Sequence, residues 1–355
     1  MQTKKKILVA PLNMGLGHAT RCIPIIEALD NHGFEPIIAS DGAALALLKK
    51  EFPQHTALEL PPCRIEYPHK GSFFKVKQLL GMPRILRAVA RERRHVGHLV
   101  QKHGIDGIVS DSRPGARCSG LPNVYITHLL SVPGDTNFIT AELHKQFIRQ
   151  YTECWVPDVK GSPNLSGRLG HTEDASLNLK YIGPMSRLHK KPATHKYDLM
   201  VLLSGPEPQR QLLEDKLVKE LYGQMGRIIF IRGVVEDEEK TEKRGNIIFY
   251  NFMNTATLEQ AFNESGLVLC RSGYTTIMDL AKLGKKAFFI PTPGHYEQEY
   301  LAKKLKKAGL VPYATQKNFK VKDLAKADVY KGLKEINGMA KWKDLFCLFE
   351  GKRKL

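Results

Sequence analysis

The sequence predicts an α/β protein built from two parallel-sheet domains that follow one another along the chain. Short apolar runs alternate with helical patterns throughout, as they do where helices connect the parallel strands of a sheet. A length of 355 residues suggests about two domains, each large enough for a core of its own. A segment near the middle, rich in Pro, Lys and Thr, has no apolar periodicity and marks the division between them.

The first domain is predicted to cover residues 1–185, and a linker is predicted at 186–196. The apolar runs that indicate its strands are 6–10, 36–40, 107–110, 124–127 and 154–156. The helical patterns between them are 18–32, 43–52 and 83–103. This alternation is the one expected of a Rossmann-like domain.

The second domain is predicted to cover residues 197–335 and to repeat the same pattern. Its strands are expected at 198–203, 228–231, 247–250, 267–269 and 287–290, with a helix at 210–225. Residues 336–355 are expected to form a C-terminal helix, within 339–349, and a basic tail that could pack back on the first domain. Open sheets of this kind bind ligands outside the carboxyl ends of their strands, so we expect the two sheets to face a common cleft.

The formal net charge of +18 at pH 7 favours anionic partners. Nucleic acid, anionic lipid and sugar nucleotides all qualify, but no zinc finger, helix-turn-helix or aromatic RNA-binding motif accompanies the charge. We therefore expect no nucleic-acid partner. The cysteines lack the close spacing of a zinc site or a disulfide framework. No apolar run approaches the roughly 20 residues of a membrane span, and we expect a cytoplasmic protein.

Basic and apolar residues are interleaved at helical spacing between residues 70 and 102. This pattern fits a helix that lies on an anionic membrane surface. It also fits a helix that packs on the core and turns a solvated basic side outward. The basic residues concerned are Lys75, Lys77, Arg84, Arg87, Arg91, Arg93 and Arg94.

A turn rich in small polar residues joins a strand to a helix in the second domain. The strand ends at Cys270, and Arg271, Ser272 and Gly273 lead into a helix. Backbone N–H groups at a helix N-terminus bind anions, so the amides from Gly273 through Tyr274 to Thr275 are candidates for a phosphate. Asp279 follows about one helical turn later and could hold a ribose. The turn therefore fits a nucleotide diphosphate, or simply an ordinary strand-to-helix connection.

The turn after the first strand carries Gly15, Gly17 and His18. It is not the dinucleotide fingerprint, because Thr20 stands where the third glycine belongs. At a helix N-terminus a neutral imidazole is favoured over its cation, and a neutral imidazole can take a proton from a hydroxyl group or water. We expect His18 to be the catalytic base, although a lone histidine is often structural.

Other candidates follow neighbouring strands of the two predicted sheets. Asp111 and His128 could hold an acceptor hydroxyl or support His18, or they could be capping residues. In the second domain, Ser204 and Gly205 match a phosphate-contacting turn, and Arg232 could meet a diphosphate. Gln298 and Glu299 offer groups suited to sugar hydroxyls, or they could belong to the polar face of a helix.

Two kinds of catalytic apparatus are missing from the sequence. No acidic pair or histidine cluster has metal-ligand spacing, so we expect no metal and no cofactor. No GxSxG elbow is present for a serine nucleophile.

The motif from Cys270 to Ala281, with Pro291 to Tyr300, resembles the donor-binding domain of glycosyltransferase family 28. Arg271, Ser272 and Gly273 match the family's turn, Asp279 stands in place of its ribose-binding glutamate, and Gln298 matches the first of its two sugar-reading glutamines. Glu299 replaces the second. Backbone atoms at Met253 would read the base. The resemblance implies the two-domain GT-B fold, a UDP-sugar donor, inversion at the anomeric carbon and no bound metal.

The N-terminal turn, with Gly15, Gly17, His18 and Arg21, is instead similar to the GxGHxxR turn of UDP-sugar hydrolases of the same superfamily. The resemblances together imply transfer of a hexose or N-acetylhexosamine to a hydroxyl acceptor, which is lipid-linked or a glycan at a membrane surface. Such an enzyme would be cytoplasmic and peripheral at the inner face of the cell membrane. Hydrolysis or 2-epimerisation of a UDP-sugar remains an alternative, as does non-catalytic binding of a sugar nucleotide.

Overall fold

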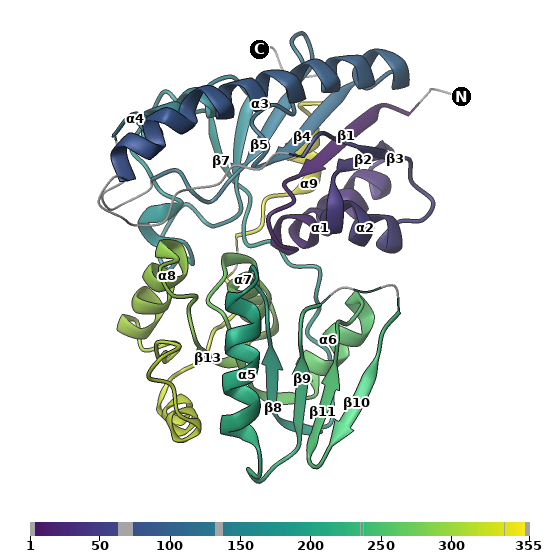
Figure 1. The fold of residues 1–355 in the computed structure, drawn as a ribbon. Coiled ribbons are helices and arrows are strands. Elements are labelled where there is room, and N and C mark those ends of the chain that lie inside the picture. The colour runs from purple at the N-terminus through teal and green to yellow at the C-terminus, as the bar shows by residue number, and fades with distance from the viewer. Residues whose placement is uncertain are drawn as a thin grey trace. The chain divides into compact units, whose positions relative to one another are not determined.

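A computed structural model describes residues 4–62, 74–131, 138–234, 236, 238–336 and 338–351. The chain divides into two compact units (Figure 1). The first consists of Met1–Met185 with Asn337–Leu355, and the second of Ser186–Ile336.

The first unit contains a seven-stranded sheet with the order β3-β2-β1-β4-β5-β6-β7. Every pair of neighbouring strands is parallel. The strand order reverses direction between β1 and β4, as it does in a doubly wound Rossmann-like domain. The strands are β1 (Lys6–Pro11), β2 (Glu35–Ser40), β3 (Ala57–Glu59), β4 (Gly107–Asp111), β5 (Asn123–Ile126), β6 (Glu153–Val156) and β7 (Leu179–Tyr181).

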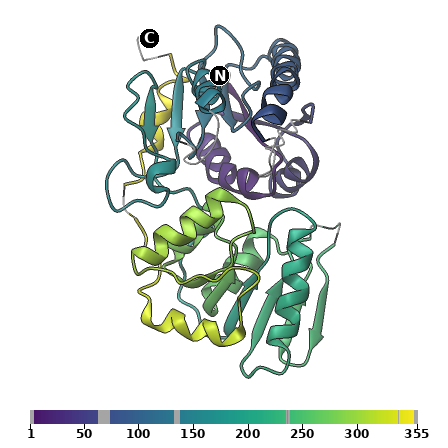
Figure 2. The same ribbon diagram turned by 60° about the vertical axis from the view of Figure 1, so that its left-hand side comes forward.

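Helices cover both faces of this sheet (Figures 1 and 2). Helix α3 turns Val96 toward one face, where it joins a core cluster with Leu8 and Ile108 of β1 and β4. Helices α1 and α2 lie on the other side of the sheet. The helices are α1 (Gly17–Asn31), α2 (Gly42–Glu51), α3 (Phe74–His103), α4 (Phe138–Ile148), the short 3-10 helix η1 (Gly167–Leu169) and α9 (Trp342–Phe346).

The C-terminal segment packs on the first unit through aromatic rings. Phe346 and Phe349 are 1% and 2% exposed, and their ring centroids lie 5.6 and 6.2 Å from that of Phe34. The site is closely filled, because a Cβ atom on Gly107 would lie 2.5 Å from the Phe349 ring. The side chain of Lys5 donates a hydrogen bond to the Phe349 carbonyl. Helix α9 is shorter than the helix expected within 339–349.

The second unit contains a six-stranded sheet with the order β10-β11-β9-β8-β12-β13. Strand β10 runs antiparallel to β11 at the edge, and the other pairs are parallel. The strands are β8 (Tyr197–Leu202), β9 (Ile228–Ile231), β10 (Thr241–Arg244), β11 (Ile247–Tyr250), β12 (Ser265–Cys270) and β13 (Lys286–Phe289).

The core of the second unit forms where helices pack on this sheet. Leu213 and Leu217, four residues apart on α5, meet Phe230 and Phe249 of β9 and β11 because such spacing places side chains on one helix face. The helices are α5 (Gln209–Leu221), α6 (Thr255–Asn263), α7 (Tyr274–Leu283), α8 (Tyr296–Lys307) and the 3-10 helix η2 (Val321–Val329).

Residues 186–196, for which the sequence predicts a linker, are hydrogen-bonded to α6 of the second unit. The His189 amide donates to the Glu259 carboxylate at 2.7 Å, and the Lys191 amide to the Asn263 side chain at 3.0 Å. Leu188 is completely buried.

The predicted fold class, an α/β protein with two Rossmann-like parallel-sheet domains, is confirmed. None of the helices in the described part of the chain is both long and apolar enough to cross a membrane.

Candidate active site

In the first unit, the polar side chains predicted to be catalytic gather where the strand order reverses. Pro11 at the end of β1 pairs with Asp111 at the end of β4, so the turns after both strands open at the same edge. Ligands of doubly wound sheets bind at this kind of position. The β1–α1 turn contains Gly15 at φ +73°, which glycine adopts readily. Helix α1 begins at Gly17, and no side chain caps it.

Asp111 is the centre of a buried hydrogen-bonded cluster. Its Oδ1 atom lies 2.8 Å from Nδ1 of His18. Arg21, one helical turn after His18, donates to both carboxylate oxygens, through Nε and Nη2. Asp111 and Arg21 are 0% and 2% exposed, whereas the side chain of His18 is 14% exposed. The cluster therefore presents one partly accessible imidazole on a buried ion pair.

The ionisation of Asp111 follows from these contacts. Burial alone would raise the pKa of Asp111, but the charge of Arg21, then that of His18, and the hydrogen bonds from both outweigh it. The net effect holds the pKa of Asp111 well below its usual range. Asp111 is thus a carboxylate, not a proton donor, at neutral pH.

His128, which follows β5, belongs to the same cluster. It is 6% exposed, and its Nδ1 lies 3.1 Å from Nη1 of Arg21. The structure thus brings together His18, Asp111 and His128, predicted from three separate segments. It does so through Arg21, which the sequence reasoning did not include among the site residues. The available signal was its spacing of three residues from His18, which places both on one helix face.

In the second unit, the strand order reverses between β8 and β12, and several of the predicted donor residues follow these two strands. Gly205, after β8, has φ +105°. Gly273, after β12, is the N-cap of α7, and no side chain caps this helix N-terminus. Ser272 is fully buried and donates from Oγ to the Gln298 carbonyl at 2.7 Å. Tyr274, the first residue of α7, is buried at 2% exposure; the exposed Ser204 and the half-buried Thr275 lie in the same two turns.

Arg271 is a buried cation without a carboxylate partner among the described residues. It is 1% exposed and donates only to backbone carbonyls, those of Ile290, Pro291 and Gln209, at 3.1, 3.2 and 2.8 Å. Burial lowers the pKa of Arg271 to about 10, so the side chain is still charged at pH 7.

Further polar atoms near Arg271 are buried and have no hydrogen-bond partner in the described chain. They are Nε of Arg271 itself, Oγ1 of Thr292 and Oε1 of Gln209. Buried polar atoms normally find partners in the protein or in ordered water.

Asp279 lies on α7 and is half-buried. The Ser186 hydroxyl donates to its Oδ1 at 2.6 Å. Burial raises the pKa of Asp279 to about 6, against the lowering effect of the Ser186 hydrogen bond and the charge of Arg187. The carboxylate is therefore ionised at pH 7 but close to its titration.

Gln298 and Glu299 lie in the first turn of α8, and their side chains accept hydrogen bonds from the loop before it. Oε1 of Gln298 accepts a hydrogen bond from the Thr292 amide at 2.8 Å, and Oε1 of Glu299 accepts one from the Gly294 amide at 3.0 Å. Gln298 is 8% exposed. Both side chains thus have a structural task in addition to the sugar contact expected of them.

Arg232 and Met253 follow β9 and β11 at the same edge of the sheet. Nε of Arg232 lies 3.1 Å from Oε1 of Glu214, and its guanidinium stacks over the Phe249 ring at 5.0 Å. Its charge is thus already matched, unlike that of Arg271. Met253 is 7% exposed.

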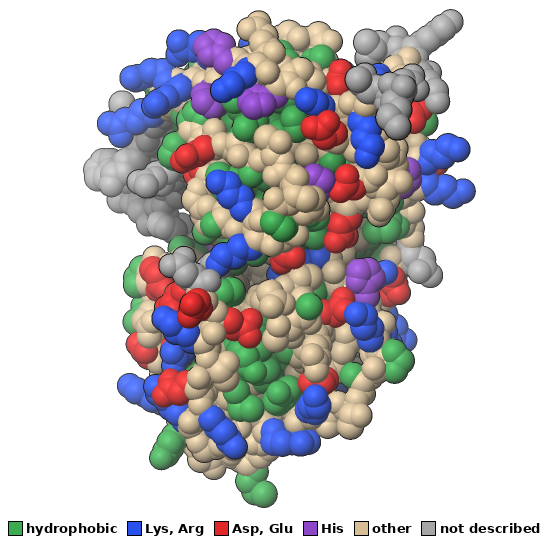
Figure 3. Space-filling model, turned by 90° about the vertical axis from the view of Figure 1, so that its right-hand side faces the viewer, with side chains coloured by type: hydrophobic (Ala, Val, Ile, Leu, Met, Phe, Trp, Pro, Cys, Tyr) green, Lys and Arg blue, Asp and Glu red, His purple; other side chains and the backbone are tan. Residues whose placement is uncertain are grey.

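The described part of the basic segment on α3 combines a buried and an exposed side. Val89, Glu92 and Val96 are buried, whereas Arg84, Arg87, Arg91 and Arg94 are exposed at a spacing that forms one stripe. Lys75 and Lys77 lie outside the described side chains. Over the face drawn in Figure 3, basic and acidic side chains are interspersed, so the net positive charge does not form a single patch there.

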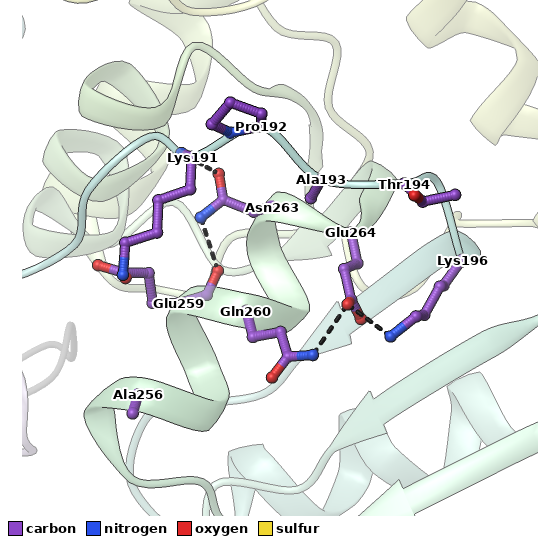
Figure 4. A pocket seen from close by; sticks show the side chains of 10 residues that line it. All are labelled: Lys191, Pro192, Ala193, Thr194, Lys196, Ala256, Glu259, Gln260, Asn263 and Glu264. Atoms are coloured by element: carbon purple, nitrogen blue, oxygen red, sulfur yellow. Dashed lines mark hydrogen bonds and ion pairs between the residues drawn. The ribbon is translucent and has the colours of Figure 1, made fainter.

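A hollow of about 470 Å³ lies between residues 191–196 and α6, away from the strand-order reversal of the second unit (Figure 4). Its charges are paired: Lys191 with Glu259 at 2.5 Å and Lys196 with Glu264 at 2.6 Å. It therefore offers a ligand no unmatched charge. Within the described ranges, no group of three His, Cys, Asp or Glu side chains is placed to hold a metal ion.

Residues 208–341 match the family model of the glycosyltransferase family 28 C-terminal domain. The protein is a glycosyltransferase, and its second unit resembles that of family 28. The match covers the turn before α7, α7 itself and α8, which carry Arg271, Asp279 and Gln298 respectively, and it confirms the resemblance noted in the sequence.

Curated relatives of this glycosyltransferase extend over most of the chain. An uncharacterized glycosyltransferase of Methanopyrus kandleri is 23% identical over 84% of this chain and 86% of its own length. The UDP-N-acetylglucosamine–N-acetylmuramyl-(pentapeptide) pyrophosphoryl-undecaprenol N-acetylglucosamine transferase of Glaesserella parasuis is 26% identical over 91% of this chain and 88% of its own.

Solved structures resemble this glycosyltransferase in fold. MurG of Acinetobacter baumannii has a TM-score of 0.57 at 11% identity and covers 98% of this chain and 99% of its own. The glycosyltransferase SnogD of Streptomyces nogalater has a TM-score of 0.60 at 16% identity, with 91% of each chain covered. At these identities the likeness shows the fold, which is GT-B.

Proposed function

We propose that the protein is an inverting, metal-independent glycosyltransferase that moves a hexose or N-acetylhexosamine from a UDP-sugar to a hydroxyl acceptor. The observation that carries the proposal is Arg271, a buried guanidinium with no carboxylate partner in the described chain, next to the uncapped N-terminus of α7. A cation and a helix N-terminus at one strand end suit a diphosphate. The printed name of the Glaesserella relative includes a UDP-sugar donor, which favours uridine as the base.

The second unit would bind the donor. In the proposed arrangement, the amides from Gly273 to Thr275, together with Ser204, Gly205 and Arg271, contact the diphosphate, and Asp279 binds the ribose hydroxyls. Backbone atoms at Met253 read the base, and Gln298 with Glu299 contact the sugar. As the bond between the anomeric carbon and the phosphate oxygen breaks, the charge that develops on UDP is stabilised by the same donors.

The first unit would remove the acceptor proton. The acceptor oxygen attacks the anomeric carbon, its proton passes to Nε2 of His18, and UDP leaves with the electron pair of the broken bond. A single displacement of this kind inverts the anomeric centre. Asp111 supports the imidazolium that forms, because its carboxylate is fixed 2.8 Å from Nδ1.

The donor proposal is tested by thermal unfolding with UDP, UMP, uridine, dTDP and a set of UDP-sugars, together with UDP release in the absence of acceptor. A ligand that binds only the folded protein raises its stability. We expect stabilisation by UDP and one or a few UDP-sugars, with little release in water. No shift with any nucleotide would overturn the proposal.

A lipid-linked acceptor is the finer part of the proposal. The printed name of the Glaesserella relative includes an undecaprenol-linked acceptor, and the exposed Arg84, Arg87, Arg91 and Arg94 supply a stripe for an anionic surface. We expect the protein to float with anionic but not with neutral vesicles.

Two variants, a test and a matched control, each change four exposed basic residues. Replacing the four stripe arginines by Gln should abolish flotation. Replacing Lys49, Lys50, Lys303 and Lys307, which are exposed elsewhere, should preserve it. Equal flotation of both variants would refute the role of the stripe.

Hydrolysis of a UDP-sugar is the second candidate function. The cluster of His18, Arg21 and Asp111 favours it, because the GxGHxxR turn resembles that of UDP-sugar hydrolases and His18 could deprotonate water as well as a hydroxyl group. Rapid release of UDP and free sugar without acceptor would establish hydrolysis, and reversible interconversion of donor isomers would establish epimerisation.

A further inference from the structure

We propose that Arg21 is a positioning residue that fixes opposite protonation of the two histidine rings beside it, with the proton on Nδ1 of His18 and on Nε2 of His128. The role in catalysis rests on the proposed function. The protonation pattern does not, because it follows from the hydrogen-bond chemistry of the buried cluster.

The argument begins with what each group can do. A guanidinium only donates hydrogen bonds, and an ionised carboxylate only accepts them. Arg21 donates to both oxygens of Asp111, through Nε and Nη2. Nδ1 of His18 lies 2.8 Å from Oδ1 of the same carboxylate. Since Asp111 cannot donate, this contact requires a proton on Nδ1 of His18, which leaves the lone pair of the neutral ring on Nε2.

Nη2 of Arg21 also lies 2.9 Å from Nδ1 of His18, and this distance offers an alternative assignment. If Nδ1 accepted a hydrogen bond from Nη2, its lone pair would face a carboxylate oxygen at 2.8 Å inside a buried cluster. Two electron-rich atoms without a proton between them repel strongly where water cannot screen them. Nη2 donates to Oδ1 of Asp111 instead, and the carboxylate receives hydrogen bonds from both sides.

His128 has the reverse arrangement. Its Nδ1 lies 3.1 Å from Nη1 of Arg21, and the guanidinium can only donate. Nδ1 of His128 therefore accepts, and the proton of the neutral ring is on Nε2. A proton on Nδ1 as well would set an imidazolium against a guanidinium inside the unit, where His128 is 6% exposed.

Other groups beside Asp111 do not compete for the proton. The Cys22 thiol lies 3.7 Å from Oδ2 of Asp111. Burial, and then the Asp111 charge, raise the pKa of Cys22 well above its usual value, so it stays a thiol. The Ser112 hydroxyl, 3.5 Å from Nη2 of Arg21, does not titrate.

The cluster thus has one site that can accept a proton, Nε2 of His18, because Arg21 holds His128 as a hydrogen-bond acceptor. His128, which the sequence suggested as a catalytic residue, becomes a second positioning residue. Its task is to hold the guanidinium that orients Asp111.

The first test is long-range proton–nitrogen NMR on protein labelled with ¹⁵N-histidine at neutral pH, without any ligand. Variants His18→Gln and His128→Gln identify the two rings among the 13 histidines. We expect the unprotonated nitrogen to be Nε2 in His18 and Nδ1 in His128. The same tautomer in both rings, or the reverse pair, would overturn the proposal, whatever the nucleotide assays show.

The second test replaces Arg21 and compares the result with a variant of an exposed arginine. Arg21→Met should remove the preference of His128 for its tautomer and lower kcat by at least about tenfold with little change in donor KM. Arg227→Met, at an exposed position just before β9, should change neither. Thermal unfolding of each variant shows whether it folds. If Arg21→Met does not fold, Arg21→Lys takes its place, since it keeps the charge but loses the forked geometry.

A third comparison tests whether His128 acts by accepting a hydrogen bond from Arg21 or only by filling space in the buried cluster. Asn at position 128 can place an oxygen near the former Nδ1 and accept from Arg21, whereas Leu cannot. His128→Asn should retain more of kcat than His128→Leu and should preserve the His18 tautomer. Equal activity in the two variants would contradict the role assigned to His128. If the unaltered protein binds no nucleotide, the proposed function is refuted, but the assignment of the two histidine tautomers is not.

Discussion

The two strand-order reversals of the molecule both hold a buried arginine, but they treat its charge differently. In the first unit Arg21 donates to the carboxylate of Asp111, and the nearby Arg113 is matched in the same way by Glu92 and Asp41, each at 2.5 Å. In the second unit Arg271 meets only backbone carbonyls. A buried charge without a partner is costly. The first reversal is thus electrostatically complete and suits proton transfer, whereas the second is incomplete and suits the binding of an anion.

The largest expected effect tests the proton-transfer side of this contrast. His18→Gln removes the proposed base and should lower kcat by about 100- to 10,000-fold, the usual contribution of general base catalysis. UDP affinity, measured by calorimetry, should stay within about twofold, because the donor contacts are assigned to the second unit. His98→Gln, an exposed histidine on α3, is the control. A comparable loss of UDP binding in His18→Gln would break the assignment.

The next effect is on stability. Asp111→Asn leaves the buried guanidinium of Arg21 unmatched and should reduce the free energy of unfolding by about 3–5 kcal/mol, measured by urea denaturation at pH 7. Asp106→Asn, at an exposed position, should cost far less. The folded-state pKa of Asp111 is depressed, so its contribution is complete above the unfolded pKa, and is lost as pH falls through the folded value. The difference between Asp111→Asn and the unaltered protein should therefore shrink below about pH 4.

Arg271→Met tests the unmatched buried charge of the second unit. It removes a charge that has no partner in the described chain, so it should destabilise the protein less than Asp111→Asn does. UDP affinity should fall by roughly 10- to 100-fold, which corresponds to the loss of a hydrogen bond to a charged group. The affinity for uridine, which has no phosphate, should be almost unchanged. Equal losses for UDP and uridine would mean that Arg271 acts on the fold of the site and not on the diphosphate.

The smallest expected effect concerns Asp279. Its folded pKa is raised to about 6 from 3.8, so the folded state holds the proton more tightly than the unfolded state. Stability then falls as pH rises from about 4 to about 6, and the loss persists above that range. Asp279→Asn should remove this slope and add about 1–3 kcal/mol at pH 7, while it weakens UDP binding. If the stability of Asp279→Asn depends on pH in the same way as that of the unaltered protein, the pKa of Asp279 is not raised in the folded state.

Most strands of the second unit's sheet were predictable because they are apolar runs in the sequence. Residues 228–231 and 247–250 are strands with the predicted bounds. Strand β10 was not predicted, since all four of its residues are exposed and polar and its pairing follows from the turn at Gly245. Helix α3 extends at least nine residues before Pro83, where the helix was expected to start, because Pro83 lies inside the helix.

The candidate site was partly predictable for a reason of topology. His18 and Asp111 are 93 residues apart in sequence, yet each follows a strand, and β1 and β4 are neighbours. Sequence reasoning expects side chains at adjacent carboxyl ends to meet. It gave no reason to bury Arg21, because a charged residue on an amphipathic helix is usually solvated and its partner comes from a distant strand. The absence of a partner for Arg271 can likewise be seen only in three dimensions.

The return of the C-terminal segment to the first unit has a consequence for how the protein is made. Phe346 and Phe349 fill the aromatic cluster around Phe34, and they leave the ribosome after every residue of the second unit. The second unit, Ser186–Ile336, is continuous in sequence and can complete its core during synthesis. The first unit must wait with this cluster open, so the part of the protein that is translated first is the last to finish folding.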